Sequence, residues 1–101
     1  MNNSLKPTID LLRSRREEIN AIAAKHGASN IRVFGSVARG EATNTSDLDL
    51  LIDLEPERSL FSLIALKQEL EEVLDLQIDL AESHSLHRLI RDRVLQEAVK
   101  L

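Results

Sequence analysis

The sequence contains no cysteine, so disulfide bonds, thiol nucleophiles and zinc–thiolate sites are all excluded. Aromatic residues are almost absent as well, since Phe34 and Phe61 are the only two and there is no tryptophan or tyrosine. The core must therefore be aliphatic. For the same reason, the chain has no aromatic platform on which nucleic-acid bases stack.

Long apolar runs are also missing. No segment approaches the ~18 consecutive apolar residues of a membrane span, and Met1-Asn2-Asn3 does not begin a signal peptide. These absences favour a cytoplasmic location without membrane contact. The 101 residues are 43% hydrophobic and 30% charged, which is ordinary for a globular protein and predicts one domain over residues 1–101.

The acidic residues gather in the centre of the chain, whose net charge is −4. Residues 47–82 carry eleven acidic and two basic side chains, a local balance of −9. Such a surface repels phosphates of nucleic acids, so direct nucleic-acid binding is not expected. It favours bound cations or a basic partner instead.

Hydrophobic periodicity predicts a small α/β domain in the order α-β-α-β-α-β-α. The first helix is expected to open at Pro7 and Thr8 and to stop at Gly27, and later helices are expected to be capped by Ser59 and Ser85. Strands are predicted at residues 31–34, 47–54 and 76–81, with a helical turn at 36–40. The last helix is expected to bury an apolar stripe of Leu86, Leu89, Ile90, Val94 and Ala98.

The strand at 47–54 carries two carboxylates close together. Asp47 and Asp49 point to the same face, because side chains alternate along a strand. The opposite face is an unbroken apolar row of Leu48, Leu50, Ile52 and Leu54. Two adjacent carboxylates repel each other, and a hard cation such as Mg²⁺ relieves that repulsion. The alternative is an ordinary solvated strand end. Asp53 lies roughly 13 Å from Asp49 and is expected to be solvated or ion-paired.

Gly35 and Ser36 follow the first strand, where free backbone N–H groups and a hydroxyl can hold phosphate oxygens. Arg39 is expected near the same phosphates. A plain turn, with Arg39 paired to Glu41, is the alternative.

Asp79 stands inside an apolar strand pattern, where aspartate is uncommon. Its position is explained if it lies beside Asp47 and Asp49 on a neighbouring strand. Glu82 is the rival third carboxylate, although it falls on the other face of the strand.

The combined pattern resembles a known signature. Gly35-Ser36, ten residues and then Asp47-Leu48-Asp49 is similar to the signature of the DNA polymerase beta-like nucleotidyltransferase superfamily. The fuller stretch GSVARGEATNTSDLDLLIDLE resembles the minimal nucleotidyltransferases (MNT proteins), which pair with HEPN toxins in prokaryotes. The resemblance runs from about Ile31 through the C-terminal RDRVLQEAVKL. It implies a mixed β-sheet packed by helices.

The resemblance also implies a function: a Mg²⁺-dependent antitoxin that transfers AMP from ATP to a hydroxyl, expected to be a tyrosine, of a HEPN ribonuclease toxin. Asp47 and Asp49 are expected to hold two Mg²⁺ ions ~4 Å apart, with Asp79 completing the second site and helping to deprotonate the hydroxyl. The phosphates are assigned to Gly35, Ser36 and Arg39.

Two alternatives remain open on the sequence. The first is an antitoxin that neutralises its toxin by binding alone. The second is a subunit of a small-molecule nucleotidyltransferase, which forms its acceptor pocket with another chain. No pattern in the sequence indicates the nucleobase preference, the oligomeric state or the modified residue of the partner.

Overall fold

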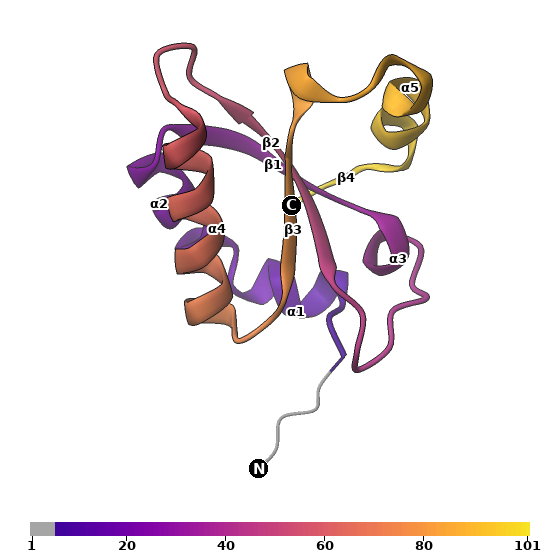
Figure 1. Cartoon of the computed structure of the whole chain (residues 1–101). Helices are drawn as coiled ribbons and strands as arrows, with labels where there is room; N and C mark the ends of the chain where they lie inside the picture. The colour runs from indigo at the N-terminus through magenta and orange to yellow at the C-terminus, as the bar shows by residue number, and fades with distance from the viewer. Residues whose placement is uncertain (1–5) are drawn as a thin grey trace.

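A four-stranded mixed sheet forms the centre of the computed structural model, which describes residues 6–101 (Figure 1). The helices are α1 (Ile9–Ser14), α2 (Arg16–Lys25), α3 (Gly35–Ala38), α4 (Leu60–Leu74) and α5 (Arg88–Glu97), with a 3₁₀ turn η1 (Ser83–Ser85). The strands are β1 (Ala28–Phe34), β2 (Leu48–Leu54), β3 (Ile78–Glu82) and β4 (Val99–Lys100). No helix of the described residues is long and apolar enough to cross a membrane.

The strand order is β3-β2-β1-β4. Strand β1 pairs antiparallel with both β2 and β4, whereas β2 and β3 run parallel. The parallel pair requires a crossover, and α4 with its flanking loops supplies it. As a result, β2 and β3 begin at the same end of the sheet, where β1 ends.

The helices lie on both faces of the sheet (Figure 1). Helices α2 and α4 cover one face, and α3 and α5 stand on the other side. The core beneath α2 and α4 is aliphatic, as the shortage of aromatic residues requires. Its members include fully buried side chains of β2 and of the helices above it, among them Leu12, Ile19, Leu48, Leu50, Ile52, Leu66 and Leu70.

The predicted α/β class with a mixed sheet packed by helices is confirmed. Thr8 and Ser59 cap α1 and α4 as expected, since their hydroxyls accept hydrogen bonds from Leu11 N and Phe61 N. The first predicted helix is two helices, because Arg15 leaves the helical conformation (φ −115°, ψ 18°) between α1 and α2. All three predicted strands are offset: β1 begins three residues early at Ala28, β2 begins one residue late at Leu48, and β3 covers Ile78–Glu82.

The C-terminal region departs from the prediction. Ser85 does not cap the last helix, because the chain first makes the turn η1, and α5 begins at Arg88 with the His87 Nδ1 accepting from Leu89 N. The expected buried stripe is wrong too. No residue of α5 is buried, and Leu89 is 86% exposed. After α5, the short strand β4, which the sequence did not predict, joins the sheet beside β1.

Candidate active site

Three strand ends meet at one end of the sheet. In the register of the strands, Phe34 of β1 lies opposite Asp49 of β2, and Asp49 lies beside Asp79 of β3. Gly35, which follows Phe34, therefore comes next to Asp49. Leu51 lies further along the same face of β2 and is fully buried. On this face, solvent therefore reaches Asp49 but not the residue two positions further along the strand. The predicted phosphate-binding turn and the predicted carboxylates are thus brought together.

The carboxylates differ in their surroundings. Asp47 precedes β2 and is exposed, Asp79 is exposed on β3, and Asp49 between them is half-buried. Burial, together with the negative charges of Asp79 and Asp47, raises the pKa of Asp49 to about 6, although the charge of Arg39 partly offsets the rise. The cluster thus carries an electrostatic cost that a bound cation would remove.

Gly35 is required by its contact with Asp49. Its φ of +72° lies in the left-handed region, and a Cβ built on it would collide with the Asp49 Oδ2. Ser36 follows in the single turn α3, which is fixed to the core by the buried side chain of Val37. Gly35 is therefore held directly against the central carboxylate, and Ser36 is the next residue of the same turn.

Arg39 lies at the C-terminal end of α3 and makes two ion pairs. Its Nε is 2.8 Å from Glu41 Oε1, as the alternative interpretation of the sequence expected, and its Nη1 is 3.0 Å from Glu97 Oε1. The hydrogen bond with Glu41 raises the pKa of Arg39, and the charges of both glutamates add to this effect. Glu97 was not predicted as a partner of Arg39, because it stands 58 residues away and no local sequence pattern connects the two.

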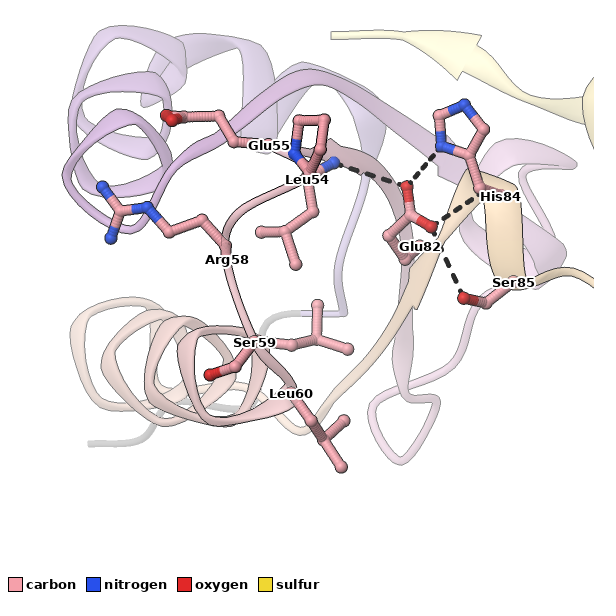
Figure 2. A pocket seen from close by; sticks show the side chains of 10 residues that line it. Leu54, Glu55, Arg58, Ser59, Leu60, Glu82, His84 and Ser85 are labelled. Atoms are coloured by element: carbon pink, nitrogen blue, oxygen red, sulfur yellow. Dashed lines mark hydrogen bonds and ion pairs between the residues drawn. The ribbon is translucent and has the colours of Figure 1, made fainter.

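Glu82 lines the pocket drawn in Figure 2, and none of the three aspartates does. It pairs in register with Ile52 and accepts hydrogen bonds from Leu54 N (3.4 Å), His84 N (2.9 Å) and Ser85 Oγ (3.4 Å), and it contacts His84 Nδ1 at 2.9 Å. Burial alone would raise the pKa of Glu82, but these hydrogen bonds lower it. The geometry thus places Asp79, and not Glu82, beside Asp49.

Asp53 is ion-paired, as predicted. Its Oδ1 lies 2.6 Å from Arg32 Nη2, and its Oδ2 accepts a hydrogen bond from Asn30 at 3.0 Å. It also accepts a hydrogen bond from Ser83 Oγ. Both carboxylate oxygens of Asp53 are therefore engaged by residues of β1 and η1, and Asp53 is not part of the candidate site.

The pocket of Figure 2 lies at the other end of β2 and β3. Its volume is about 470 Å³, and residues from Leu54 to Leu63 and from Glu82 to Ser85 line it. None of the three aspartates is among its lining residues. We therefore place the candidate site by its chemistry, at the strand ends that carry the carboxylates.

The chain matches the family model of the nucleotidyltransferase domain over residues 15–101. It belongs to this family. The nucleotidyltransferase is 44% identical over 84 residues to a protein of Methanocaldococcus jannaschii whose name gives it, by inference, the activity of a protein adenylyltransferase. The alignment covers 83% of this chain and 90% of that protein. It is 42% identical over 91 residues to the protein adenylyltransferase MntA of Thermococcus cleftensis, with 82% and 92% covered.

Solved structures agree with this assignment. A minimal nucleotidyltransferase, itself assigned by inference, superposes with a TM-score of 0.83 at 44% identity and covers 94% of this chain and 97% of its own. A second match is a chain from the structure of the complex between the tri-AMPylated HEPN toxin of Shewanella oneidensis and an MNT antitoxin. It superposes with a TM-score of 0.66 and covers 87% of this chain and 69% of its own. At 18% identity, the second likeness shows the fold alone.

The donor set of this nucleotidyltransferase fits Mg²⁺. No set of three or more His, Cys, Asp or Glu side chains in residues 6–101 is arranged to enclose a metal ion. Mg²⁺ does not need such a cage, because it keeps several waters and is commonly bound by one or two carboxylates together with substrate phosphates. Asp49 with Asp47 or Asp79 offers carboxylates of this kind. The repulsion that raises the pKa of Asp49 is the charge imbalance that a cation would relieve.

Proposed function

We propose that this minimal nucleotidyltransferase transfers AMP from ATP to a hydroxyl group, expected to be a tyrosine, of an HEPN-type toxin. In this role it acts as an antitoxin. The observation that carries the proposal is the strand register. It brings Gly35, which Ser36 follows, next to Asp49, and it brings Asp49 next to Asp79. The names of the relatives as protein adenylyltransferases support protein as the acceptor class. A structural neighbour solved with AMP-PNP supports an adenosine triphosphate as donor.

The acceptor must come from another molecule in this proposal. The 101 residues contain no tyrosine, so a tyrosine acceptor lies on a partner. Large apolar side chains are exposed on α4 and α5, among them Phe61 at 81% and Leu89 at 86%. Exposed apolar groups of this kind are typical of surfaces that bind protein partners.

The residues of the candidate site have distinct roles in the proposed reaction. Asp47 and Asp49 would hold Mg²⁺, with Asp79 at the second ion, and the metal would neutralise the triphosphate and acidify the acceptor hydroxyl. Asp79 would take the proton of that hydroxyl as its oxygen attacks the α-phosphorus. The bond from the α-phosphorus to the bridging oxygen breaks, and pyrophosphate leaves. Gly35, Ser36 and Arg39 would bind the leaving phosphates.

The test is transfer of label from ATP carrying radioactive phosphorus in the α-phosphate, in the presence of Mg²⁺ and a candidate HEPN protein of the same genome. Label on the HEPN protein, absent without Mg²⁺, is the expected result. Mass spectrometry then identifies the modified residue. If the two proteins form a tight complex in which no label is transferred, the function is inhibition by binding. Label on a small alcohol but on no protein would establish a small-molecule enzyme.

The third carboxylate can be tested directly. The variant Asp79→Asn is expected to lose at least about a hundredfold in transfer rate, because general-base catalysis contributes 10²–10⁴-fold. Glu82→Gln is its matched control, because Glu82 lies three residues away on the other face of β3. The amide oxygen of a glutamine at this position can still accept some of the same hydrogen bonds. The measurement is the rate of label transfer at saturating ATP, compared between each variant and the wild-type protein. A loss in Glu82→Gln as large as that in Asp79→Asn would contradict the assignment.

Metal binding should depend on pH. In the absence of metal the pKa of Asp49 is about 6, so the side chain is protonated below this value and ionised above it. A proton on Asp49 competes with Mg²⁺, and the affinity should fall about tenfold per pH unit below 6. Mg²⁺ titrations between pH 5 and 8 measure this dependence. An affinity that is flat down to pH 5 would show that Asp49 is not a ligand.

A further inference from the structure

Arg39 is attached to two different parts of the protein. Glu41, its first partner, is only two residues away, and its N–H donates a hydrogen bond to Ser36 O (2.9 Å), so this ion pair lies within the α3 turn itself. Glu97, its second partner, is the last residue of α5. The second pair is therefore the one that connects the guanidinium to an element far along the chain.

Glu97 is joined closely to the sheet. Ala98 follows it, and its N–H donates a hydrogen bond to Val94 O (2.9 Å) at the end of α5. The next two residues form β4, in which Val99 and Lys100 pair with Val33 and Arg32 of β1. Strand β1 leads into Gly35, which contacts Asp49. The carboxylate of Glu97 thus has a fixed place relative to the candidate phosphate-binding turn.

Two ion pairs leave most of the guanidinium available. A guanidinium has five N–H donors. Glu41 takes the one on Nε and Glu97 takes one on Nη1, so the second Nη1 donor and both donors on Nη2 have no partner among residues 6–101. The side chain of Arg39 is still 44% exposed. The arrangement therefore orients Arg39 without preventing it from binding phosphate.

We propose that Glu97 is a positioning residue, which holds Arg39 in place for the phosphates of the nucleoside triphosphate. The inference rests on the proposed function and names a residue of the same site. Fixing a long side chain before the substrate arrives removes rotamer entropy that binding would otherwise have to overcome. Arg93 also lies near Glu97, but its Nε is 4.0 Å from the second oxygen and its side chain is mostly exposed, so this pair contributes little.

The opposite effect would follow if Glu97 acted as a latch. A latch would neutralise Arg39 and compete with the triphosphate, so removing it would strengthen nucleotide binding. The three remaining donors of the guanidinium argue for positioning. The two roles predict changes of opposite sign, and a binding measurement separates them.

The experiment measures equilibrium binding of AMP-PNP with Mg²⁺ by calorimetry, for the wild-type protein and for variants at Glu97 and Arg39. Glu97→Ala is expected to weaken binding about fivefold, within the range of couplings between contacting residues. Glu97→Gln keeps an oxygen that accepts from Nη1 and should lose less than about twofold. Glu41→Ala is the matched control, with a smaller loss expected because Glu41 pairs with Arg39 within the same turn and does not connect it to α5.

The double variant gives the sharpest result. If Glu97 acts through Arg39, then Glu97→Ala should have no further effect on binding in the Arg39→Ala background. Equal losses in both backgrounds, unchanged binding in Glu97→Ala, or tighter binding would each overturn the inference. Wild-type protein that fails to bind AMP-PNP at all would overturn the proposed function and this inference with it.

Discussion

Replacing Asp49 with asparagine is expected to abolish nucleotidyl transfer while making the metal-free protein more stable at neutral pH. The loss of activity follows from the loss of a metal ligand, which removes several kcal/mol of transition-state stabilisation. About 4 kcal/mol corresponds to a loss of about a thousandfold in rate. Label transfer from ATP to the partner measures this loss. Asp47→Asn should lose transfer activity as well.

The gain in stability follows from the raised pKa of Asp49. The native pKa is about 6 against an ordinary value of 3.8, so the folded state binds the proton more tightly than the unfolded state does. Ionised Asp49 therefore costs stability above pH 6, and the cost disappears as pH falls from 6 to 3.8. Solvent screens the group in part, so we expect Asp49→Asn to gain about 1 kcal/mol at pH 7.5 and nothing at pH 3.5.

Urea unfolding at the two pH values, in the presence of a chelator, measures the change in stability. Added Mg²⁺ should reduce the difference, because the metal stabilises the wild-type protein and not the variant. A variant that is less stable than the wild type at pH 7.5 would contradict the electrostatic account of the cluster. A variant that keeps wild-type transfer would remove Asp49 from the site.

The second large effect is expected from Gly35→Ala, with Gly40→Ala as its matched control. Both glycines have a φ of +72°, so an alanine at either position should cost about 1–2 kcal/mol of stability through backbone strain alone. Their surroundings differ. A Cβ on Gly35 would meet the carboxylate of Asp49, whereas a Cβ on Gly40 has no atom within 4 Å.

The two variants should therefore be similar in stability and very different in activity. The carboxylate of Asp49 lies at the end of a flexible side chain and can rotate away from a Cβ on residue 35, which limits the extra cost in stability. Displacing a catalytic group by ~1 Å costs about a hundredfold in rate. We expect that loss in Gly35→Ala and less than about threefold in Gly40→Ala, measured by label transfer and thermal unfolding. Equal activities would show that the contact between Gly35 and Asp49 is not needed.

The sequence by itself determined the fold class and named the residues to consider for the candidate site. Alternation in β2 separated Asp47 and Asp49 from the apolar row of Leu48, Leu50 and Ile52, and the structure buries that row. Capping chemistry located the starts of α1 and α4 at Thr8 and Ser59. These features are local, since they depend on strand periodicity and on neighbours within one helical turn.

Strand pairing decided what periodicity left open. Asp79 and Glu82 were both candidates, and the parallel register of β2 and β3 placed Asp79 beside Asp49 and Glu82 beside Ile52. Register is a property of two segments, so neither segment alone specifies which of its residues meets the other. The pairing of Asp49 with Phe34, which brings Gly35 to the carboxylate, was settled in the same way.

The C-terminal region shows most clearly where tertiary structure decided the outcome. An amphipathic pattern predicted a buried stripe in α5, yet the chain placed α5 with Leu89 and Ile90 exposed and used β4 to join the sheet. Periodicity shows that a helix has an apolar side, and it does not show whether the same chain covers that side. The ion pair of Arg39 with Glu97 depended on this placement, because 58 residues separate the two and only the packing of α5 beside α3 brings them together.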